Sequence, residues 1–284
     1  MIDHRVSIII PHRNQPAQLR KCLDRLMELG YGNQEIIVVD NGSEMIPDYF
    51  NNYPVKMFRS DSKPSPYIAR NLGIERSGCD IIALLDVNAI VESGWLEYAL
   101  DLLRDDTILG GIVARPNPAR LNLFQRFDYL HSVIDPKDPG PIKALPATNL
   151  FFYKKVWEVV GPFQEVRSLG DMEWTVRARN LGYKLTVNSH VRFQYPFKSG
   201  KAFTAKCRRL GRGHAENDFH NFPLWYVVKN MLPPSPRFVH RMQSKNRREK
   251  MNLSLLQIFG LCYWVKINYG IGYISNPMTS KKSH

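Results

Sequence analysis

The stretch IIALLDVN, residues Ile81–Asn88, places a carboxylate and then an amide directly after a run of apolar residues. The run is as long as a strand and shows no apolar/polar alternation, which is typical of a strand covered on both faces. Such strands belong to parallel sheets with helices on both sides. The stretch therefore predicts an α/β fold in which Asp86 and Asn88 lie at the carboxyl end of a strand.

The residues around this stretch repeat the pattern of short apolar runs and amphipathic segments. Further strands are expected at residues 6–10, 36–39 and 55–58. Helices are expected after the N-cap Asn14 as far as Gly30, from Tyr67 to Arg76, and from Ser93 onward. The segment 116–146 is rich in proline and is expected to be irregular.

Charge divides the 284-residue chain, whose net charge is +13. Residues 191–284 hold 17 Lys and Arg against 3 Asp and Glu, whereas residues 1–190 hold 22 against 23. This partition indicates a neutral core followed by a segment that meets something anionic. We expect a first domain over residues 1–222 and a basic, aromatic-rich helical extension over residues 223–284.

Several classes of protein are not indicated. The four cysteines have no partner at metal-ligand or disulfide-framework spacing, and no signal peptide precedes the first strand, so a cytoplasmic protein is expected. The apolar stretch Leu253–Val265 is well short of the roughly 20 residues that a spanning helix needs. Because no nucleic-acid motif accompanies the basic segment, no nucleic-acid partner is expected.

Polar residues end each of the three clearest strands. The three ends are Pro11-His12-Arg13-Asn14, Asp40-Asn41-Gly42-Ser43 and Asp86-Val87-Asn88. A single Asp or Asn often does no more than open a turn. In an open α/β sheet, however, ligands bind beyond the carboxyl ends of the strands, so three such ends together predict a binding site.

Four segments resemble, in order and spacing, the opening motifs of family 2 glycosyltransferases: VSIIIPHRN (6–14), IVVDNGS (37–43), ARNLGIE (69–75) and IALLDVN (82–88). The resemblance continues through NLFF (149–152), VGPF (160–163) and GDMEW (170–174), and covers about residues 5–215. It implies a GT-A fold, with a mostly parallel central sheet and helices on both faces. It also implies an inverting hexosyltransferase that moves a sugar from a nucleotide-sugar donor to an acceptor hydroxyl.

The resemblance assigns the donor site to Pro11, His12, Arg13, Asp40, Arg70, Asp86 and Asn88. Asp40 lies where the family holds the nucleoside, and its carboxylate suits a base N–H or a ribose hydroxyl. Arg13 is placed to stack on the base, and Arg70 to face the pyrophosphate.

A divalent cation, Mg²⁺ or Mn²⁺, is the implied cofactor, with Asp86 and Asn88 as its ligands. Asp86 falls at the first position of the family's D-x-D motif, but Asn88 supplies a neutral amide where the second carboxylate would be. A further departure is Tyr195-Pro196, where many relatives carry His-Pro.

The general base implied by the resemblance is Asp171, with Glu173 as the second candidate. A carboxylate there would take the proton of the acceptor hydroxyl. The structural alternatives are that Asp171 is an N-cap and that Glu173 forms an i,i+4 pair with Arg177.

The acceptor implied is a glycan or a lipid-linked molecule. The basic run 237–250 and the apolar stretch 253–265 suit docking on an anionic membrane surface, and equally suit packing on the core. Docking would make the protein peripheral on the cytoplasmic face. Two other classes remain open: a nucleotidyltransferase, although its usual Gly-rich loop is missing after the first strand, and a non-catalytic nucleotide-sugar-binding relative.

Overall fold

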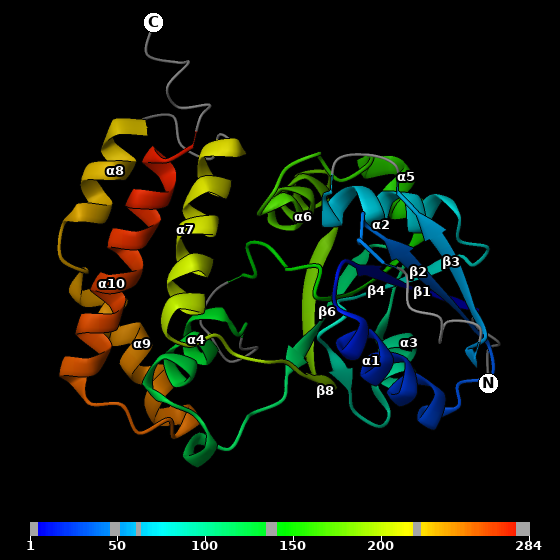
Figure 1. Ribbon diagram of the computed structural model, residues 1–284, viewed down its shortest axis with the longest axis horizontal. Coiled ribbons are helices and arrows are strands. Elements are labelled where there is room, and N and C mark those ends of the chain that lie inside the picture. The colour runs from blue at the N-terminus through cyan, green and yellow to red at the C-terminus, as the bar shows by residue number, and fades with distance from the viewer. Residues whose placement is uncertain (1–4, 46–51, 61–63, 135–140, 218–222, 277–284) are drawn as a thin grey trace, which may run out of the picture. The chain divides into compact units, whose positions relative to one another are not determined.

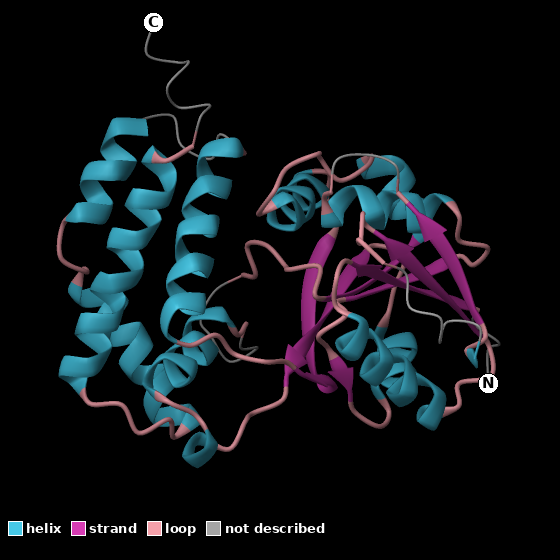
Figure 2. Ribbon diagram, viewed as in Figure 1, coloured by secondary structure: helices cyan, strands magenta, loops and turns pink. Residues whose placement is uncertain are grey.

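Eight strands form one mixed sheet in the residues that the computed structural model describes, which are 5–45, 52–60, 64–134, 141–217 and 223–276 (Figure 1 and Figure 2). The strands are β1 (Val6–His12), β2 (Gln34–Asp40), β3 (Val55–Arg59), β4 (Ile81–Leu85), β5 (Ile90–Val91), β6 (Thr107–Val113), β7 (Asn149–Tyr153) and β8 (Lys184–Gln194). Their order is β3-β2-β1-β4-β7-β6-β8-β5. The first four in this order run parallel, β7 is antiparallel to both neighbours, β8 is parallel to β6, and β5 is antiparallel to β8. The four strands expected from the sequence therefore form the parallel half of the sheet.

Helices cover both faces of this sheet. They are α1 (Pro16–Leu29), α2 (Pro66–Glu75), α3 (Trp95–Leu102), α5 (Lys154–Val160) and α6 (Gly170–Asn180). Figure 1 shows α1 and α3 on one face and α2, α5 and α6 on the other. This arrangement confirms the expected α/β architecture.

Alternation along β7 explains how each face obtains its own core. Phe151 contacts Trp95 of α3, with ring centroids 5.0 Å apart, whereas its neighbour Phe152 contacts Trp174 of α6, also at 5.0 Å. Successive side chains of a strand point to opposite faces, so one apolar run supplies both cores. Full burial of each large apolar side chain contributes about 2 kcal/mol.

The remaining helices form a second compact unit from Arg115–Val133, Val166–Leu169 and the described residues from Pro196 on. They are α4 (Leu123–Ser132), α7 (Gly200–Glu216), α8 (Pro223–Met231), α9 (Pro236–Glu249) and α10 (Leu255–Ile274), after a short 3₁₀ turn at Pro118–Arg120. We call this part the helical unit, and the part that carries the sheet the sheet unit. The core of the helical unit includes Phe127, Phe203 and Met242, together with Ile258 and Val265 of α10.

Helix α4 corrects the expectation of an irregular segment over residues 116–146. Asn122 and Gln125 form a reciprocal capping box at its start, and Phe127 and Leu130 are buried. Prolines precede and follow the helix in the sequence but are absent from Leu123–Ser132, so the proline content of the whole segment concealed the capping signal. Residues 135–140 of this segment lie outside the described residues.

The compact units divide the chain at other positions than the predicted domain boundary after residue 222. Helices α4 and α7 precede that boundary and belong to the helical unit. The boundary itself adjoins residues 218–222, which lie outside the described residues. It stays a prediction. In the part of the chain that the structure describes, no helix is both long enough and apolar enough to cross a membrane.

Candidate functional site

The carboxyl ends of β1, β2 and β4 lie side by side at one edge of the sheet. β1 pairs in parallel with both β2 and β4, and His12 is the register partner of Asp40. The N–H of Asn41 donates to the carbonyl of His12 at 2.7 Å. Pro11 and His12 therefore end beside Asp40 on one side, and Asp86 directly follows β4 on the other. The convergence expected from the three polar strand ends is confirmed.

Asn14 ties the loop after β1 to the loop after β2. Its N–H donates to the hydroxyl of Ser43 at 2.9 Å, and its side-chain oxygen accepts from the N–H of Glu44 at 3.0 Å. Helix α1 begins at Pro16, and Gln15 occupies its N-cap without a side-chain bond. The expected capping role of Asn14 is therefore wrong, because its side chain binds the neighbouring loop instead.

The side chains of Asp40 and His12 are buried together. His12 Nδ1 lies 3.5 Å from Asp40 Oδ1, and the carboxylate also accepts from the N–H of Ser43 at 3.2 Å. His12 Nε2 accepts from the N–H of Gln15 at 3.2 Å, so the proton of the neutral ring is on Nδ1, facing Asp40. Burial lowers the pKa of His12, although the Asp40 carboxylate opposes that shift. The pair is thus a neutral imidazole against a carboxylate, and the role of Asp40 toward a nucleoside stays a prediction.

The two arginines of the predicted donor site differ in burial. Arg13 is exposed on the loop after β1, whereas Arg70 of α2 is only 5% exposed. The Arg70 guanidinium lies 5.5 Å from the ring centre of Tyr67, and its Nε has no hydrogen-bond partner in the described part of the chain. A buried guanidinium N–H without a partner is expected where an anion binds.

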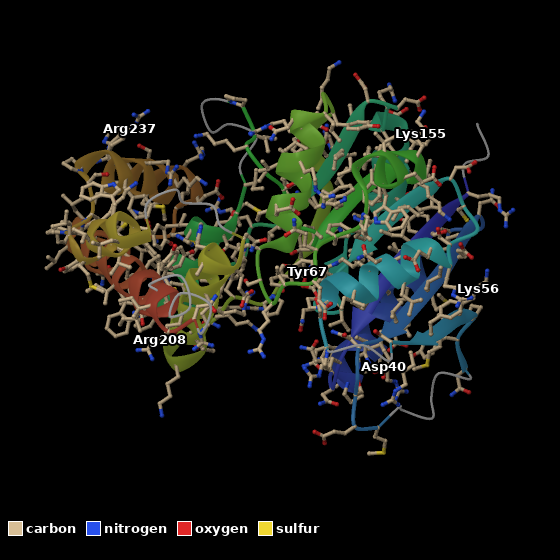
Figure 3. The ribbon with its side chains drawn as sticks, turned by 90° about the horizontal axis from the view of Figure 1, so that it is seen from above. Asp40, Lys56, Tyr67, Lys155, Arg208 and Arg237 are labelled. Atoms are coloured by element: carbon tan, nitrogen blue, oxygen red, sulfur yellow. The ribbon has the colours of Figure 1, made fainter. Side chains whose placement is uncertain are left out.

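Helix α2 is fixed at its start to the β2 loop. Ser65 caps the helix by accepting from the N–H of Tyr67 at 3.3 Å, and the N–H of Ser65 donates to the side chain of Asn41 at 2.9 Å. Figure 3 shows Tyr67 on α2 and Asp40 at the end of β2. The cap and the loop therefore hold the first turn of α2, and with it Tyr67 and Arg70, at the carboxyl edge of the sheet.

Asp86 is partly exposed and accepts a hydrogen bond from a tyrosine that follows β8. The hydroxyl of Tyr195, directly after β8, donates to Asp86 Oδ2 at 3.0 Å. Tyr195 stands where the resemblance led to a histidine, and it supplies a hydrogen bond to the carboxylate. Asn88, two residues on, is also partly exposed.

The side chains of Asp86 and Asn88 suit a hard divalent cation. Both offer oxygen atoms, and Mg²⁺ is usually held by one or two carboxylates completed by substrate phosphates and water. Within the described residues there is no group of three or more His, Cys, Asp or Glu side chains suited to a metal. A cation at this position would therefore need the oxygens of a diphosphate to complete its shell.

Asp171 lies in the first turn of α6, and both of its carboxylate oxygens are bonded. The hydroxyl of Tyr67 donates to Oδ1 at 3.2 Å, and the N–H of Ala147 donates to Oδ2 at 3.0 Å. Because α6 begins at Gly170, Asp171 lies inside the helix rather than at its N-cap. The N–H of Met172 also donates to Oδ1 at 3.0 Å. Oδ2 keeps a second lone pair, so Asp171 can still accept a hydrogen bond from a substrate hydroxyl.

Glu173 forms the predicted pair with Arg177. Arg177 Nε donates to Glu173 Oε1 at 3.0 Å and Nη2 to Oε2 at 3.2 Å, while the same guanidinium binds the carbonyls of Val160 and Pro162. Both carboxylate oxygens thus hold the arginine that joins α6 to the end of α5. The possible role of Glu173 as a base stays a prediction.

The sequence did not identify two tyrosines, Tyr67 and Tyr195, as residues of the site. Tyr67 lies three residues before Arg70 on a capped helix, so i,i+3 spacing could have associated their side chains. Tyr195 was noted only as a departure from a motif. Its bond to Asp86 spans 109 residues, and no local pattern predicts it.

Comparisons with known proteins agree on one family. Residues 7–160 match the family described as Glycosyl transferase family 2. Over 297 residues the chain is 26% identical to glycosyltransferase AglE of Haloferax volcanii, covering 98% of this chain and 97% of that protein.

Two solved structures resemble the fold. A mannosyltransferase from Pyrobaculum calidifontis, in complex with GDP-Man and Mn²⁺, has a TM-score of 0.60 at 15% identity, covering 98% of this chain and 88% of its own. Residues 1–349 of Staphylococcus aureus TarS, in complex with UDP-GlcNAc, have a TM-score of 0.54 at 12% identity, covering 99% and 92%. At these identities the likeness concerns the fold.

Proposed function

Because the chain belongs to glycosyltransferase family 2 and has the GT-A type of fold, we propose that it transfers a sugar from a nucleotide-sugar donor to an acceptor hydroxyl with inversion at the anomeric carbon. The reaction exchanges one glycosidic bond for another. The acceptor oxygen bonds to the anomeric carbon, the bond from that carbon to the nucleoside diphosphate breaks, and the diphosphate leaves with the electron pair.

The observation that carries this proposal is the position of Tyr67 between a cation and a carboxylate. Its ring lies against the buried Arg70 guanidinium, and its hydroxyl binds Asp171. Tyr67 therefore holds the Arg70 guanidinium, which suits phosphates, near the Asp171 carboxylate, which suits the proton of a hydroxyl. Transfer from a diphosphate donor to a hydroxyl acceptor requires two such groups close together.

We propose Asp171 as the general base. Its carboxylate would accept the proton of the acceptor hydroxyl while that oxygen attacks the anomeric carbon from the face opposite the diphosphate. The hydrogen bonds from Tyr67, Met172 and Ala147 fix the carboxylate and leave a lone pair of Oδ2 for the substrate. Glu173 is a weaker candidate, because Arg177 engages both of its oxygens.

Arg70 would bind the pyrophosphate, and its unpartnered Nε supports this role. Asp86 and Asn88 would hold Mg²⁺ or Mn²⁺ beside it, with Tyr195 orienting the Asp86 carboxylate. When bound, such a cation neutralises phosphate charge that builds up as the diphosphate departs. The remaining donor contacts would come from Pro11, His12, Arg13 and Asp40.

The acceptor that we propose is a hydroxyl of a glycan or of a lipid-linked molecule. A basic C-terminal extension that binds a membrane surface would favour the second kind. One solved structure of similar fold contains GDP-Man and the other contains UDP-GlcNAc. The donor should therefore be identified with a panel of nucleotides.

Thermal unfolding with GDP, UDP, CDP, ADP and dTDP, each with and without Mn²⁺, tests donor binding. A nucleotide at about 100 times its Kd should stabilise the protein by about 2.7 kcal/mol. Asp86→Ala should abolish the Mn²⁺-dependent part of the shift. Asp80→Ala, at the opposite end of β4, is the matched control and should keep it. If none of the nucleotides stabilises the wild-type protein, donor binding is disproved.

Asp171→Asn separates catalysis from structure. The amide oxygen can take the place of Oδ1 and accept from the Tyr67 hydroxyl and the Met172 N–H, so that the bond from Ala147 is lost and the fold should survive. Transfer with the donor found in the panel should fall by about 100- to 10,000-fold, with little change in donor affinity. Glu173→Gln, which still accepts one bond from Arg177, should retain most activity. The reverse result would make Glu173 the base.

A further inference from the structure

Helix α8 exposes a row of large apolar side chains. Leu224 is 77% exposed and Trp225 59%, and the row continues through Val228, Met231 and Leu232. The first four have the spacing i, i+1, i+4 and i+7, which places them on one face of α8, and Leu232 directly follows the helix. Surface residues of this size occur singly on most proteins, whereas a continuous row indicates an interaction site.

The opposite face of α8 is packed, so the apolar row is a second face of this helix. Tyr226 and Asn230 are buried, and the Tyr226 ring lies 4.7 Å from that of Tyr273 in α10. Lys266 of α10 donates to the carbonyl of Lys229 at 2.6 Å. The helix is thus held to α10 by one face, with its apolar row turned outward.

A second group of exposed apolar residues lies at the start of α10. Leu255, Leu256 and Phe259 are exposed, whereas Ile258 on the same turns is buried in the core of the helical unit. Tyr263, one turn after Phe259, donates to the carbonyl of Met231 at 2.9 Å. This bond joins the second group to the end of the α8 row. We call the α8 row together with Leu255, Leu256 and Phe259 the apolar face.

Positive charge is concentrated in the same part of the chain as the apolar face. Residues 223–276 contain eight Lys and Arg and one acidic residue, Glu249. Arg237, Arg241 and Arg247 of α9 and Lys250 after it are exposed, and Figure 3 shows Arg237 projecting from the helical unit. The charge argues against a second copy of this chain as the occupant, because two such surfaces repel each other. A nucleic acid would bind the cations but leave the aliphatic row in water.

We propose that the apolar face and the basic residues of α9 dock on the surface of an anionic lipid bilayer. Trp225 and the aliphatic side chains enter the boundary between headgroups and acyl chains, and the arginines of α9 bind lipid phosphates. This assignment differs from docking through the whole stretch 253–265, whose Ile258, Leu261 and Val265 are core residues. The use of this docking to reach a lipid-linked acceptor rests on the proposed function, whereas the docking itself does not.

Co-sedimentation of the full chain with vesicles tests the proposal, without donor or acceptor. On phosphatidylcholine vesicles with about 30% phosphatidylglycerol at about 0.1 M salt, the wild-type protein should bind. The variant Leu224→Ser/Trp225→Ser/Val228→Ser should lose at least about tenfold in partitioning, since each buried CH₂ contributes to binding. Arg237→Glu/Arg241→Glu should lose a similar factor on anionic vesicles.

Val159→Ser/Leu181→Ser is the matched control, because these side chains are 63% and 56% exposed in the sheet unit. It should bind vesicles like the wild type, and thermal unfolding should show all variants folded. Failure of the wild type to sediment, or wild-type binding by the α8 variant, would overturn the proposal. So would a dimer in sedimentation velocity that the α8 variant dissociates, with no vesicle binding. Vesicle binding without any sugar transfer would disprove the proposed function alone.

Discussion

At the scale of single residues, Tyr67 joins three parts of the site. Its hydroxyl binds Asp171 of α6, its ring lies 5.5 Å from the Arg70 guanidinium, and it stacks on Phe163 at 6.3 Å. The hydroxyl and the ring thus have separate partners. Two substitutions can therefore separate them.

Tyr67→Phe should lower the rate of transfer and leave nucleoside diphosphate affinity unchanged, because the bond to Asp171 is lost while the ring stays beside Arg70. A hydrogen bond to a charged group contributes about 1.5–3 kcal/mol, which corresponds to a loss of roughly 10- to 150-fold in kcat. Tyr67→Leu should also weaken diphosphate binding, by about 3- to 30-fold, because the contact between ring and guanidinium is lost. Calorimetry and steady-state kinetics measure the two effects. Wild-type kcat for Tyr67→Phe would show that the hydroxyl does not position the base.

At the scale of elements, two glycines let α7 and α10 approach closely. A Cβ at Gly211 of α7 would lie 2.2 Å from the carbonyl oxygen of Tyr269, and one at Gly272 of α10 would lie 2.1 Å from the carbonyl oxygen of Arg208. The opposing atoms are helix backbone, which cannot turn aside as the end of a side chain can. The two helices must therefore separate to admit even a methyl group.

Gly211→Ala and Gly272→Ala should each reduce the free energy of unfolding by about 1–3 kcal/mol, as overpacking does. Gly260→Ala in the same α10 is the matched control, because a Cβ there meets no atom within 4 Å. That change should raise the stability by up to about 1 kcal/mol through helix propensity alone. Denaturant unfolding followed by circular dichroism measures all three. Equal effects at the three positions would contradict the close crossing.

At the scale of the whole molecule, a buried histidine makes the helical unit sensitive to acid. His131 of α4 packs between Phe127 and Tyr269, and burial, aided by the Lys206 charge, lowers its pKa to about 4. Since the ring titrates near pH 6.5 when unfolded, the unfolded chain binds a proton between pH 6.5 and 4 that the folded chain does not. The helical unit therefore loses stability as the pH falls through this window.

His131 should change the free energy of unfolding by at most about 1.4 kcal/mol per pH unit. Hydrogen exchange resolved by segment should show α7 and α10 losing protection between pH 6.5 and 5, after correction for intrinsic exchange rates. In His131→Gln this pH dependence should become smaller. An unchanged slope in that variant would assign the acid sensitivity to other groups.

The sequence by itself determined the parallel half of the sheet, the edge at which the site lies and the family. These depend on short apolar runs, on residues that directly follow them, and on the order of motifs along the chain. Because parallel neighbours end at the same edge, His12, Asp40 and Asp86 could be associated without coordinates.

The tertiary structure alone decided which side chains meet across the fold and which apolar residues face water. Tyr67 and Asp171 are 104 residues apart, and Tyr195 and Asp86 are 109 apart, so no local spacing relates them. In α10, Leu261 enters the core whereas Leu255 and Leu256 remain exposed, although all three belong to one apolar segment. Periodicity shows that a helix has an apolar face, but the packing of the neighbouring elements determines whether that face is covered.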